Sequence, residues 1–182
     1  MNKRRVDAIL RRRRGVLLDI SLGGQPQPNA VTMQELWSTQ RREHGISSAQ
    51  ARRVLPPALR LPFPLPDRCV HTAVVTHVLE YLDPGLFFAW WDELHRVMRV
   101  GGIVHVSGPY GADDSSGWLS DPAHRTRVIE TTFSFLDPKA PPYETHASVG
   151  RPTPKPWRVM AFARVPATFG TYSYNATLTA VE

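Results

Sequence analysis

The sequence predicts an α/β protein in which a mostly parallel sheet ends in an antiparallel hairpin. Short apolar runs of strand type alternate with segments whose apolar residues recur at helical spacing. The last two alternating runs instead follow each other across a short loop that contains proline and glycine, as in a hairpin. Strands that alternate with helices usually form parallel sheets. We therefore expect a parallel sheet with helices on both faces and one antiparallel strand near its edge.

The pattern places each element along the chain. The expected strands cover residues 16–20, more weakly 30–33, then 70–76, 103–107, 157–165 and 172–181. The expected helices cover residues 35–44, 48–55, 85–99 and 126–136, and Gly101-Gly102 is expected to stop the third of them. Its aromatic residues, at helical spacing, are expected to be core: Phe87, Phe88, Trp90 and Trp91.

Length and composition predict one domain. The chain has 182 residues, of which 42% are hydrophobic, enough for one core and too few for two. We expect a basic arm or helix over residues 1–15 and an α/β domain over residues 16–182. No apolar run is long enough to span a membrane, so we expect a cytoplasmic protein without a membrane partner. The single cysteine, Cys69, excludes an internal disulfide, and no metal-binding motif is present.

Charge is concentrated at the N-terminus. From Lys3 to Arg14 the chain carries seven of its 22 basic residues and one acid, Asp7, whereas the remainder is neutral. Such an arm suits nucleic acid phosphates or an acidic partner. The alternative is a solvated basic helix that covers the sheet through its apolar residues Val6, Ile9 and Leu10.

The expected strand ends indicate where a ligand would lie. In open α/β sheets ligands bind beyond the carboxyl ends of the strands, at the switch in strand order. The loops expected there are residues 19–28, 33–36, 77–82 and the segment from Gly108 onward. We expect these four loops to form one cleft.

Four segments of the sequence carry a family resemblance in their order and spacing: LLDISLGGQPQP, LPFPLPDRCVHTAVVTHVLEYLD, ELHRVMRVGGIVHVSGPY and WLSDPAHRTRV. Together they resemble the class I S-adenosylmethionine-dependent methyltransferases, in particular the small methyltransferase-like proteins of bacteria and phages. The resemblance covers about residues 16–136 and implies a Rossmann-like fold with S-adenosylmethionine as cofactor.

The resemblance also implies a set of cofactor-binding residues. Asp19 and Gly23 would lie at the methionine moiety, and Ser21 stands where the family has its first glycine. Gln34, with Glu35 beside it, matches the acid that holds the ribose hydroxyls. The segment THVLEYL would pack on the adenine, so that its ring is flanked by His77 and Leu79.

Three positions depart from the family pattern. The Ser21 side chain occupies space where backbone normally approaches the ligand, and Gln34 offers a diol only one carbonyl oxygen. Pro57, at the place of the acid that usually receives the adenine amine, offers no side-chain acceptor. The sequence therefore predicts a partly degenerate site of weakened affinity. Asp19 has a simpler interpretation as the cap of a turn, and His77 as a hydrogen-bonded histidine at a strand end.

The segment WLSDPAHRTRV is implied to cover the acceptor side of the cleft. His124 and Asp121 are then the candidate catalytic residues, with His124 accepting a proton, since an imidazole titrates near neutral pH. Arg127 and Tyr110 are the candidate substrate-binding residues. The alternative is structural: Asp121 and Pro122 would cap and start a helix that has His124 in its first turn.

These observations predict an S-adenosylmethionine-dependent methyltransferase of unknown acceptor, small or macromolecular, acting as a monomer or homodimer. The alternative is a methyltransferase-fold binding or assembly module without catalysis, whose basic arm contacts nucleic acid. The chain lacks the Asn/Asp-Pro-Pro-Tyr/Phe sequence after its strands, which argues against amino methylation of adenine or cytosine in DNA.

Overall fold

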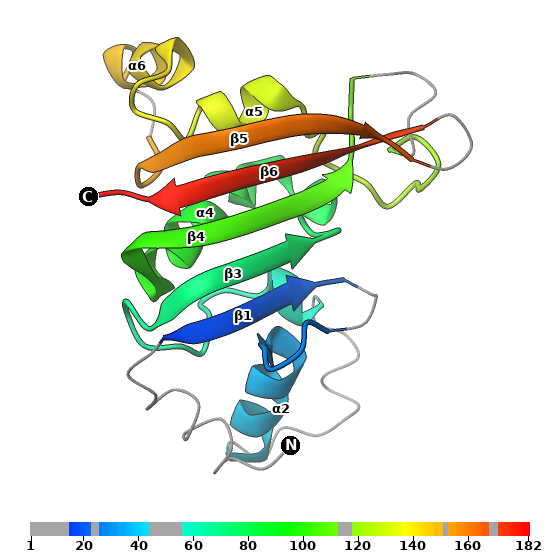
Figure 1. Ribbon diagram of the computed structural model, residues 1–182, viewed down its shortest axis with the longest axis vertical. Helices are drawn as coiled ribbons and strands as arrows, with labels where there is room; N and C mark the ends of the chain where they lie inside the picture. Colours follow the sequence, from blue (N-terminus) through cyan, green and yellow to red (C-terminus); the bar gives the residue numbers. More distant parts are fainter. Residues whose placement is uncertain (1–14, 23–25, 44–55, 113–117, 151–152, 168–170) are drawn as a thin grey trace.

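The computed structural model describes residues 15–22, 26–43, 56–112, 118–150, 153–167 and 171–182. They build one six-stranded sheet with the order β2-β1-β3-β4-β6-β5 (Figure 1). Neighbours from β2 to β4 pair in parallel, and β6 pairs antiparallel with both β4 and β5. The predicted fold class, a mostly parallel Rossmann-like sheet with a C-terminal antiparallel hairpin and helices, is confirmed.

The six strands fall close to the expected residues. They are β1 (Val16–Ser21), β2 (Val31–Thr32), β3 (Val70–Thr76), β4 (Met98–Pro109), β5 (Trp157–Pro166) and β6 (Tyr172–Ala180). β3 matches its predicted range, because its β-branched residues form a fully internal strand. β2 has only two residues, since α2 begins directly after it.

Four α-helices lie in the described residues, and two of them, at residues 87–97 and 130–134, are shorter than expected. They are α2 (Met33–Glu43), α4 (Phe87–Val97), α5 (Glu130–Ser134) and α6 (Pro141–Ser148), with short 3-10 turns at η1 (Pro57–Leu59), η2 (Leu79–Tyr81) and η3 (Pro84–Leu86). α6 was not predicted from the sequence. The helix expected at residues 48–55, the basic arm and Gly23 lie outside the described residues.

The end of the third predicted helix needs correction. α4 ends at Val97, four residues before the glycine pair, and Met98 already pairs with Val70 in the sheet. Gly101 adopts a φ of 75°, and the pairing with β3 shifts in register before it resumes at Ile103. The glycines therefore form an irregular stretch inside β4 rather than the end of a helix.

The helix predicted over residues 126–136 is also wrong for its first half. The backbone N–H groups of Arg125 and Thr126 donate to the carbonyl of Glu80, at 2.7 and 3.1 Å, and the Thr126 hydroxyl donates to the Leu82 carbonyl. These distant partners hold the segment extended against η2, so that the helix begins only at Glu130.

The core lies on one face of the sheet. α4 lies behind the strands in Figure 1, and its Trp90 and Trp91, together with Trp157 of β5, are completely buried. Their rings meet edge to face, with centroids 5.5 Å apart for Trp90–Trp91 and 5.2 Å for Trp91–Trp157. The prediction that the aromatic residues of this helix are core is confirmed for Phe87, Trp90 and Trp91.

The opposite face is open over β4, β5 and β6. Alternate side chains there are exposed, among them Ile103, His105 and Asn175. Among the described residues, α4 and α5 thus cover this part of the sheet from one side, and the helices expected on the second face do not cover it.

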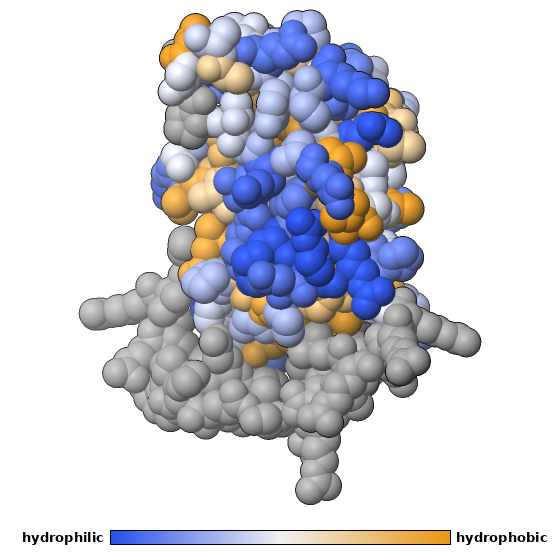
Figure 2. All heavy atoms as spheres, turned by 90° about the vertical axis from the view of Figure 1, so that its left-hand side faces the viewer, coloured by the Kyte–Doolittle hydropathy of each residue, from blue (hydrophilic) through white to orange (hydrophobic). Residues whose placement is uncertain are grey.

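The end of the sheet where β3 and β4 begin lies on the side seen in Figure 2, which is largely hydrophilic above the residues drawn in grey. Arg96, in the last turn of α4, donates to the carboxylates of Glu93 and Asp67 and to the carbonyls of Phe63 and Leu65. This network stabilises the connection that leads into β3. None of the helices in the described residues is long and apolar enough to cross a membrane.

Candidate functional site

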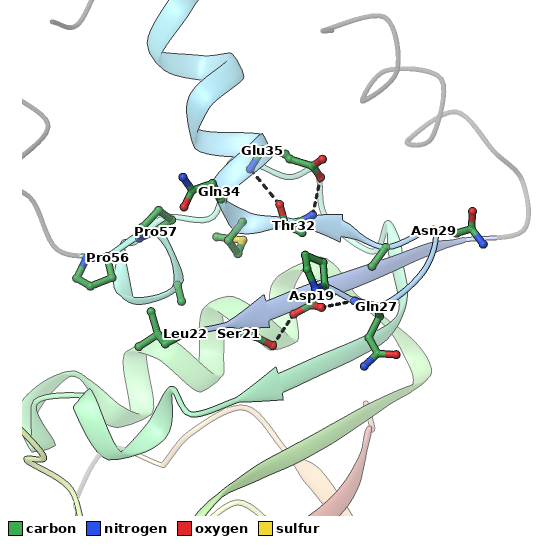
Figure 3. A pocket seen from close by; sticks show the side chains of 14 residues that line it. Asp19, Ser21, Leu22, Gln27, Asn29, Thr32, Gln34, Glu35, Pro56 and Pro57 are labelled. Carbon is green, nitrogen blue, oxygen red and sulfur yellow. Dashed lines mark hydrogen bonds between the residues drawn. The ribbon is translucent and has the colours of Figure 1, made fainter. Parts of the chain in front are cut away.

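A pocket of about 660 Å³ lies at the carboxyl end of β1, and we refer to it as the first pocket (Figure 3). Its walls come from the end of β1, residues 26–30, the start of α2 and η1. β1 has β2 on one side and β3 on the other, so the strand order switches beside it. The first pocket therefore occupies the place where open α/β sheets bind ligands.

Asp19 closes the base of the first pocket. Its Oδ1 atom accepts a hydrogen bond from the Ser21 hydroxyl at 2.5 Å, and its Oδ2 atom accepts one from the backbone N–H of Gln27 at 2.8 Å. The residue is only 4% exposed. The Gln27 bond ties the strand to the returning loop, as the turn-capping interpretation expects, and the same carboxylate faces the pocket.

The start of α2 forms the opposite wall. Thr32 and Glu35 bond reciprocally: Thr32 N–H donates to Glu35 Oε2 at 3.0 Å, and Glu35 N–H donates to the Thr32 hydroxyl at 3.2 Å. This capping box fixes the first turn of the helix. Gln34 is exposed and lies toward Pro57, whereas Glu35 turns back over Thr32 (Figure 3).

The remaining wall, Pro56 to Ala58, was not anticipated as a whole. The Trp90 indole N–H donates to the Ala58 carbonyl at 2.9 Å, which anchors η1 on α4. The proline pair in the sequence predicts an irregular connection but gives no sign of where that connection folds. Pro57 presents no side-chain acceptor to the first pocket, as expected.

The charge of the first pocket has one sign. Among the described residues that line it, Asp19 and Glu35 carry charge and none is basic. The Asp19 carboxylate has room for further donors, because a carboxylate has about four lone-pair positions and Asp19 accepts the two bonds from Ser21 and Gln27. The lining thus suits a ligand with positive charge and with hydroxyl or amine donors.

His77 follows β3 directly and adopts a left-handed backbone, with φ 54°. Its backbone N–H donates to the Ser107 carbonyl, and the Nδ1 atom of its ring lies 2.9 Å from Oε1 of Glu80. This hydrogen bond raises the pKa of the imidazole above its usual value, although partial burial opposes the effect. Leu79, which was predicted to flank the adenine, is completely buried in the core. Its side chain therefore does not line the first pocket.

Glu80 is also completely buried. Its second oxygen, Oε2, and the hydroxyl of Tyr174 have no hydrogen-bond partner among the residues that the structure describes. Both atoms surround Gly108, where an added Cβ would lie 3.1 and 3.0 Å from them. Burial and the nearby carboxylate raise the pKa of Tyr174 well above 10, so its phenol stays protonated. Any side chain larger than hydrogen at position 108 would disturb this group.

Residues 118–128 fold over η2. Asp121 accepts from the Tyr81 hydroxyl at 2.7 Å and from Ala123 N–H at 2.8 Å, which lowers the pKa of its carboxyl group. The His124 side chain is only 5% exposed; its Nδ1 atom lies 2.7 Å from the Trp118 carbonyl and its Nε2 atom 3.9 Å from Asp121. The segment forms turns at this point, so Asp121 and Pro122 do not begin a helix.

A second pocket, of about 380 Å³, adjoins the first and shares Leu22 and Pro56 with it. Its other lining residues are Leu59, Tyr81, Pro122, Ala123 and Arg125. The four loops expected to form one cleft therefore divide: the first two line the first pocket, and parts of the other two line the second. Neither Asp121 nor His124 lines this pocket, whereas three of their neighbours that were not predicted as site residues do: Pro122, Ala123 and Arg125.

Arg127 and Tyr110 lie apart from both pockets. The Arg127 guanidinium lies over the Trp118 ring, 4.9 Å from its centroid. Tyr110 packs near Phe162, and the Arg164 guanidinium lies 5.2 Å from its ring centroid, at the hairpin. As placed, these two predicted substrate-binding residues do not join Asp19, Ser21, Gln34 and Glu35, which do lie together.

No family model matches the chain, and no curated protein matches it. Solved structures do. A SAM-dependent methyltransferase from Archaeoglobus fulgidus is 16% identical, with 97% of this chain and 90% of that chain covered and a TM-score of 0.48. Geranyl diphosphate C-methyltransferase from Streptomyces coelicolor A3(2) is 12% identical, with 92% and 71% covered and a TM-score of 0.49. The [4+2]-cyclase SpnF is 16% identical, with 98% and 80% covered and a TM-score of 0.48. Because one fold hosts many reactions, these likenesses show the fold, and the function depends on the site.

Proposed function

We propose that the first pocket binds S-adenosylmethionine and that the chain is a methyltransferase. The observation that carries this proposal is the composition of the pocket: two carboxylates, Asp19 and Glu35, and no basic residue among the described lining. The pocket lies beside β1 at the switch in strand order, where this type of sheet binds nucleotides.

The lining fits such a cofactor in charge, size and hydrogen bonding. A sulfonium and an ammonium group suit the negative lining, and the Asp19 and Gln34 oxygens can accept from amine or ribose hydroxyl donors. A volume of about 660 Å³ is in the range of small-molecule sites, roughly 300–1,000 Å³. Pro56, Pro57 and Leu22 offer an apolar wall for a base.

When bound, S-adenosylmethionine supplies a methyl group that is already activated on a sulfonium. The protein's work is then to orient the acceptor and, where required, to remove its proton. For proton removal the family resemblance implies His124 with Asp121, but the His124 side chain is only 5% exposed and its Nδ1 atom is engaged by the Trp118 carbonyl. His77 is a second candidate, because Glu80 holds its Nδ1 side and its side chain is about half exposed.

Calorimetry with S-adenosylmethionine and S-adenosylhomocysteine tests the proposal. We expect weak binding of both, and a loss of at least about tenfold in Asp19→Asn, which keeps the shape of the side chain but removes its charge. Glu144→Gln, on the exposed side of α6, is the matched control and should bind like the wild type. Absence of binding of either ligand at millimolar concentration would refute the proposal.

A finding of binding without methyl transfer would favour the alternative, a non-catalytic module of the same fold. The basic arm on which that alternative depends lies outside the described residues, and the described site gives it no specific support.

A further inference from the structure

The second pocket differs from the first in chemistry. Its lining is apolar or aromatic in six positions: two prolines, Leu22, Leu59, Ala123 and the Tyr81 ring. Arg125 is the one charged residue among the described lining, and no carboxylate lines the pocket. The charged side chains that line the two adjoining pockets are therefore of opposite sign: carboxylates line the first pocket, and a guanidinium lines the second.

The polar tip of Tyr81 is already engaged. Its hydroxyl donates to Asp121 Oδ2 at 2.7 Å, and this bond raises the pKa of Tyr81 to about 12, so the phenol is neutral. A ligand in the second pocket therefore meets Tyr81 through its ring. This leaves the Arg125 guanidinium as the side chain able to recognise a charged group.

Arg125 is well placed to accept a new partner. Its backbone N–H donates to the Glu80 carbonyl at 2.7 Å, which fixes its position on the loop. Its Nη1 atom lies 3.6 Å from Asp83 Oδ2, and both side chains are more than half exposed. An exposed ion pair of this length contributes little, so exchange of Asp83 for a ligand anion costs little.

From these contacts we propose that the second pocket binds the methyl acceptor as a small apolar or aromatic carboxylic acid, whose carboxylate pairs with Arg125. A guanidinium recognises a carboxylate by two parallel hydrogen bonds, and the apolar walls take up the body of the molecule. The negative lining of the first pocket disfavours binding of the same acid there, so the acceptor and the cofactor are expected to bind in different pockets. The acceptor role rests on the proposed function; the binding chemistry does not.

The experiment compares phenylacetate with phenylacetamide, which has the same shape but no charge. Titrations are performed with and without saturating S-adenosylhomocysteine. We expect the wild type to bind the acid about tenfold more tightly than the amide. Arg125→Gln should abolish this preference, while Arg158→Gln, which changes an exposed basic residue of β5 outside the pocket, should retain it. Asp83→Asn should strengthen acid binding, because it frees Arg125.

The outcomes separate the two proposals. If S-adenosylhomocysteine binds but the acid and amide bind equally, or if the preference survives in Arg125→Gln, the acid site is refuted and the proposed function stands. If the acid binds through Arg125 but neither cofactor form binds, the acceptor role is refuted together with the proposed function. Acid binding that strengthens with S-adenosylhomocysteine present supports both.

Discussion

The Nδ1 atom of His77 lies 2.9 Å from Oε1 of Glu80, so that a half-exposed imidazole is held by a completely buried carboxylate. The pair lies at the carboxyl end of β3, the edge where the pockets open. His77 adopts a left-handed backbone there, a conformation rare for residues other than glycine and often found at functional sites. The hydrogen bond orients the ring, and about half of the side chain stays exposed.

We expect Glu80→Gln to lower the pKa of His77, because the substitution removes the hydrogen bond to a charged acceptor that raises it. NMR titration of the histidine ring protons measures this change. Glu144→Gln, distant on α6, should leave the titration as it is.

The same pair predicts a pH dependence of stability. A raised pKa in the folded state stabilises the protein fully below the unfolded pKa, about 6.5, and the contribution is lost as the pH rises through the folded pKa. The difference in the free energy of unfolding between wild type and Glu80→Gln should therefore be larger at pH 5.5 than at pH 8.5. Urea denaturation at both values checks this, and equal differences would contradict it.

Substitutions of Ser21 and of Asp19 are expected to change the cofactor affinity in opposite directions. Ser21→Gly removes a side chain from the first pocket and frees Oδ1 of Asp19, so we expect S-adenosylhomocysteine to bind several-fold more tightly, about 1 kcal/mol. Ser21→Ala frees the oxygen but keeps the Cβ atom and should show an intermediate gain. Calorimetry on the three proteins decides the order. Weaker binding in both variants would mean that the Ser21 bond holds Asp19 in its binding position.

Much of the fold is predictable because local pattern and tertiary burial agree. β3 and the β5–β6 hairpin follow from β-branched and alternating residues, and the strand ends then bring Asp19, Ser21, Gln34 and Glu35 to one pocket. The extended segment before α5 is not predictable in this way. Its helical pattern is overridden by bonds from Arg125 and Thr126 to Glu80, some 45 residues earlier in the sequence.

The second pocket is hidden in the sequence for the same reason. Leu22, Leu59, Tyr81 and Arg125 come from four separate segments that only the tertiary fold brings together. The sequence shows prolines close to the strand ends. Such prolines indicate irregular backbone, but they do not indicate which segments this backbone packs against. Tertiary hydrogen bonds such as that from Trp90 to Ala58 set those positions.

The hydrogen bonds of Arg96, at the end of the sheet opposite the two pockets, are expected to stabilise the fold. Arg96→Ala removes bonds to Glu93, Asp67 and two carbonyls, and the mostly buried Glu93 loses its charged partner and keeps the Phe63 backbone N–H. We expect a loss of about 2 kcal/mol in the free energy of unfolding. Arg99→Ala, which loses one exposed bond to the Arg68 carbonyl, should cost less than about 0.5 kcal/mol. Urea denaturation compares the two variants, and equal losses would contradict the role given to the network.

A substitution of His124 distinguishes a catalytic from a structural role of residues 118–128, the segment that folds over η2. A general base requires an accessible ring nitrogen, and its removal would lower methyl transfer about 100-fold with stability unchanged. The His124 ring instead lies buried, with Nδ1 2.7 Å from the Trp118 carbonyl and its ring edge on Tyr81 at 4.8 Å between centroids. We therefore expect His124→Ala to lower the free energy of unfolding by about 1–2 kcal/mol, since buried contacts and a hydrogen bond are lost.

The readouts for His124 are urea denaturation, Trp118 fluorescence and methyl transfer per folded molecule. His105→Ala, an exposed histidine whose ring nitrogen lies 3.3 Å from the Thr177 hydroxyl on the open sheet face, is the control and should change none of them. A destabilised His124→Ala with normal turnover per folded molecule would assign the histidine to the architecture of the loop and leave proton removal to His77. Unchanged stability with a 100-fold loss of turnover would require the ring to leave Trp118 during catalysis, since only then does a nitrogen reach the acceptor.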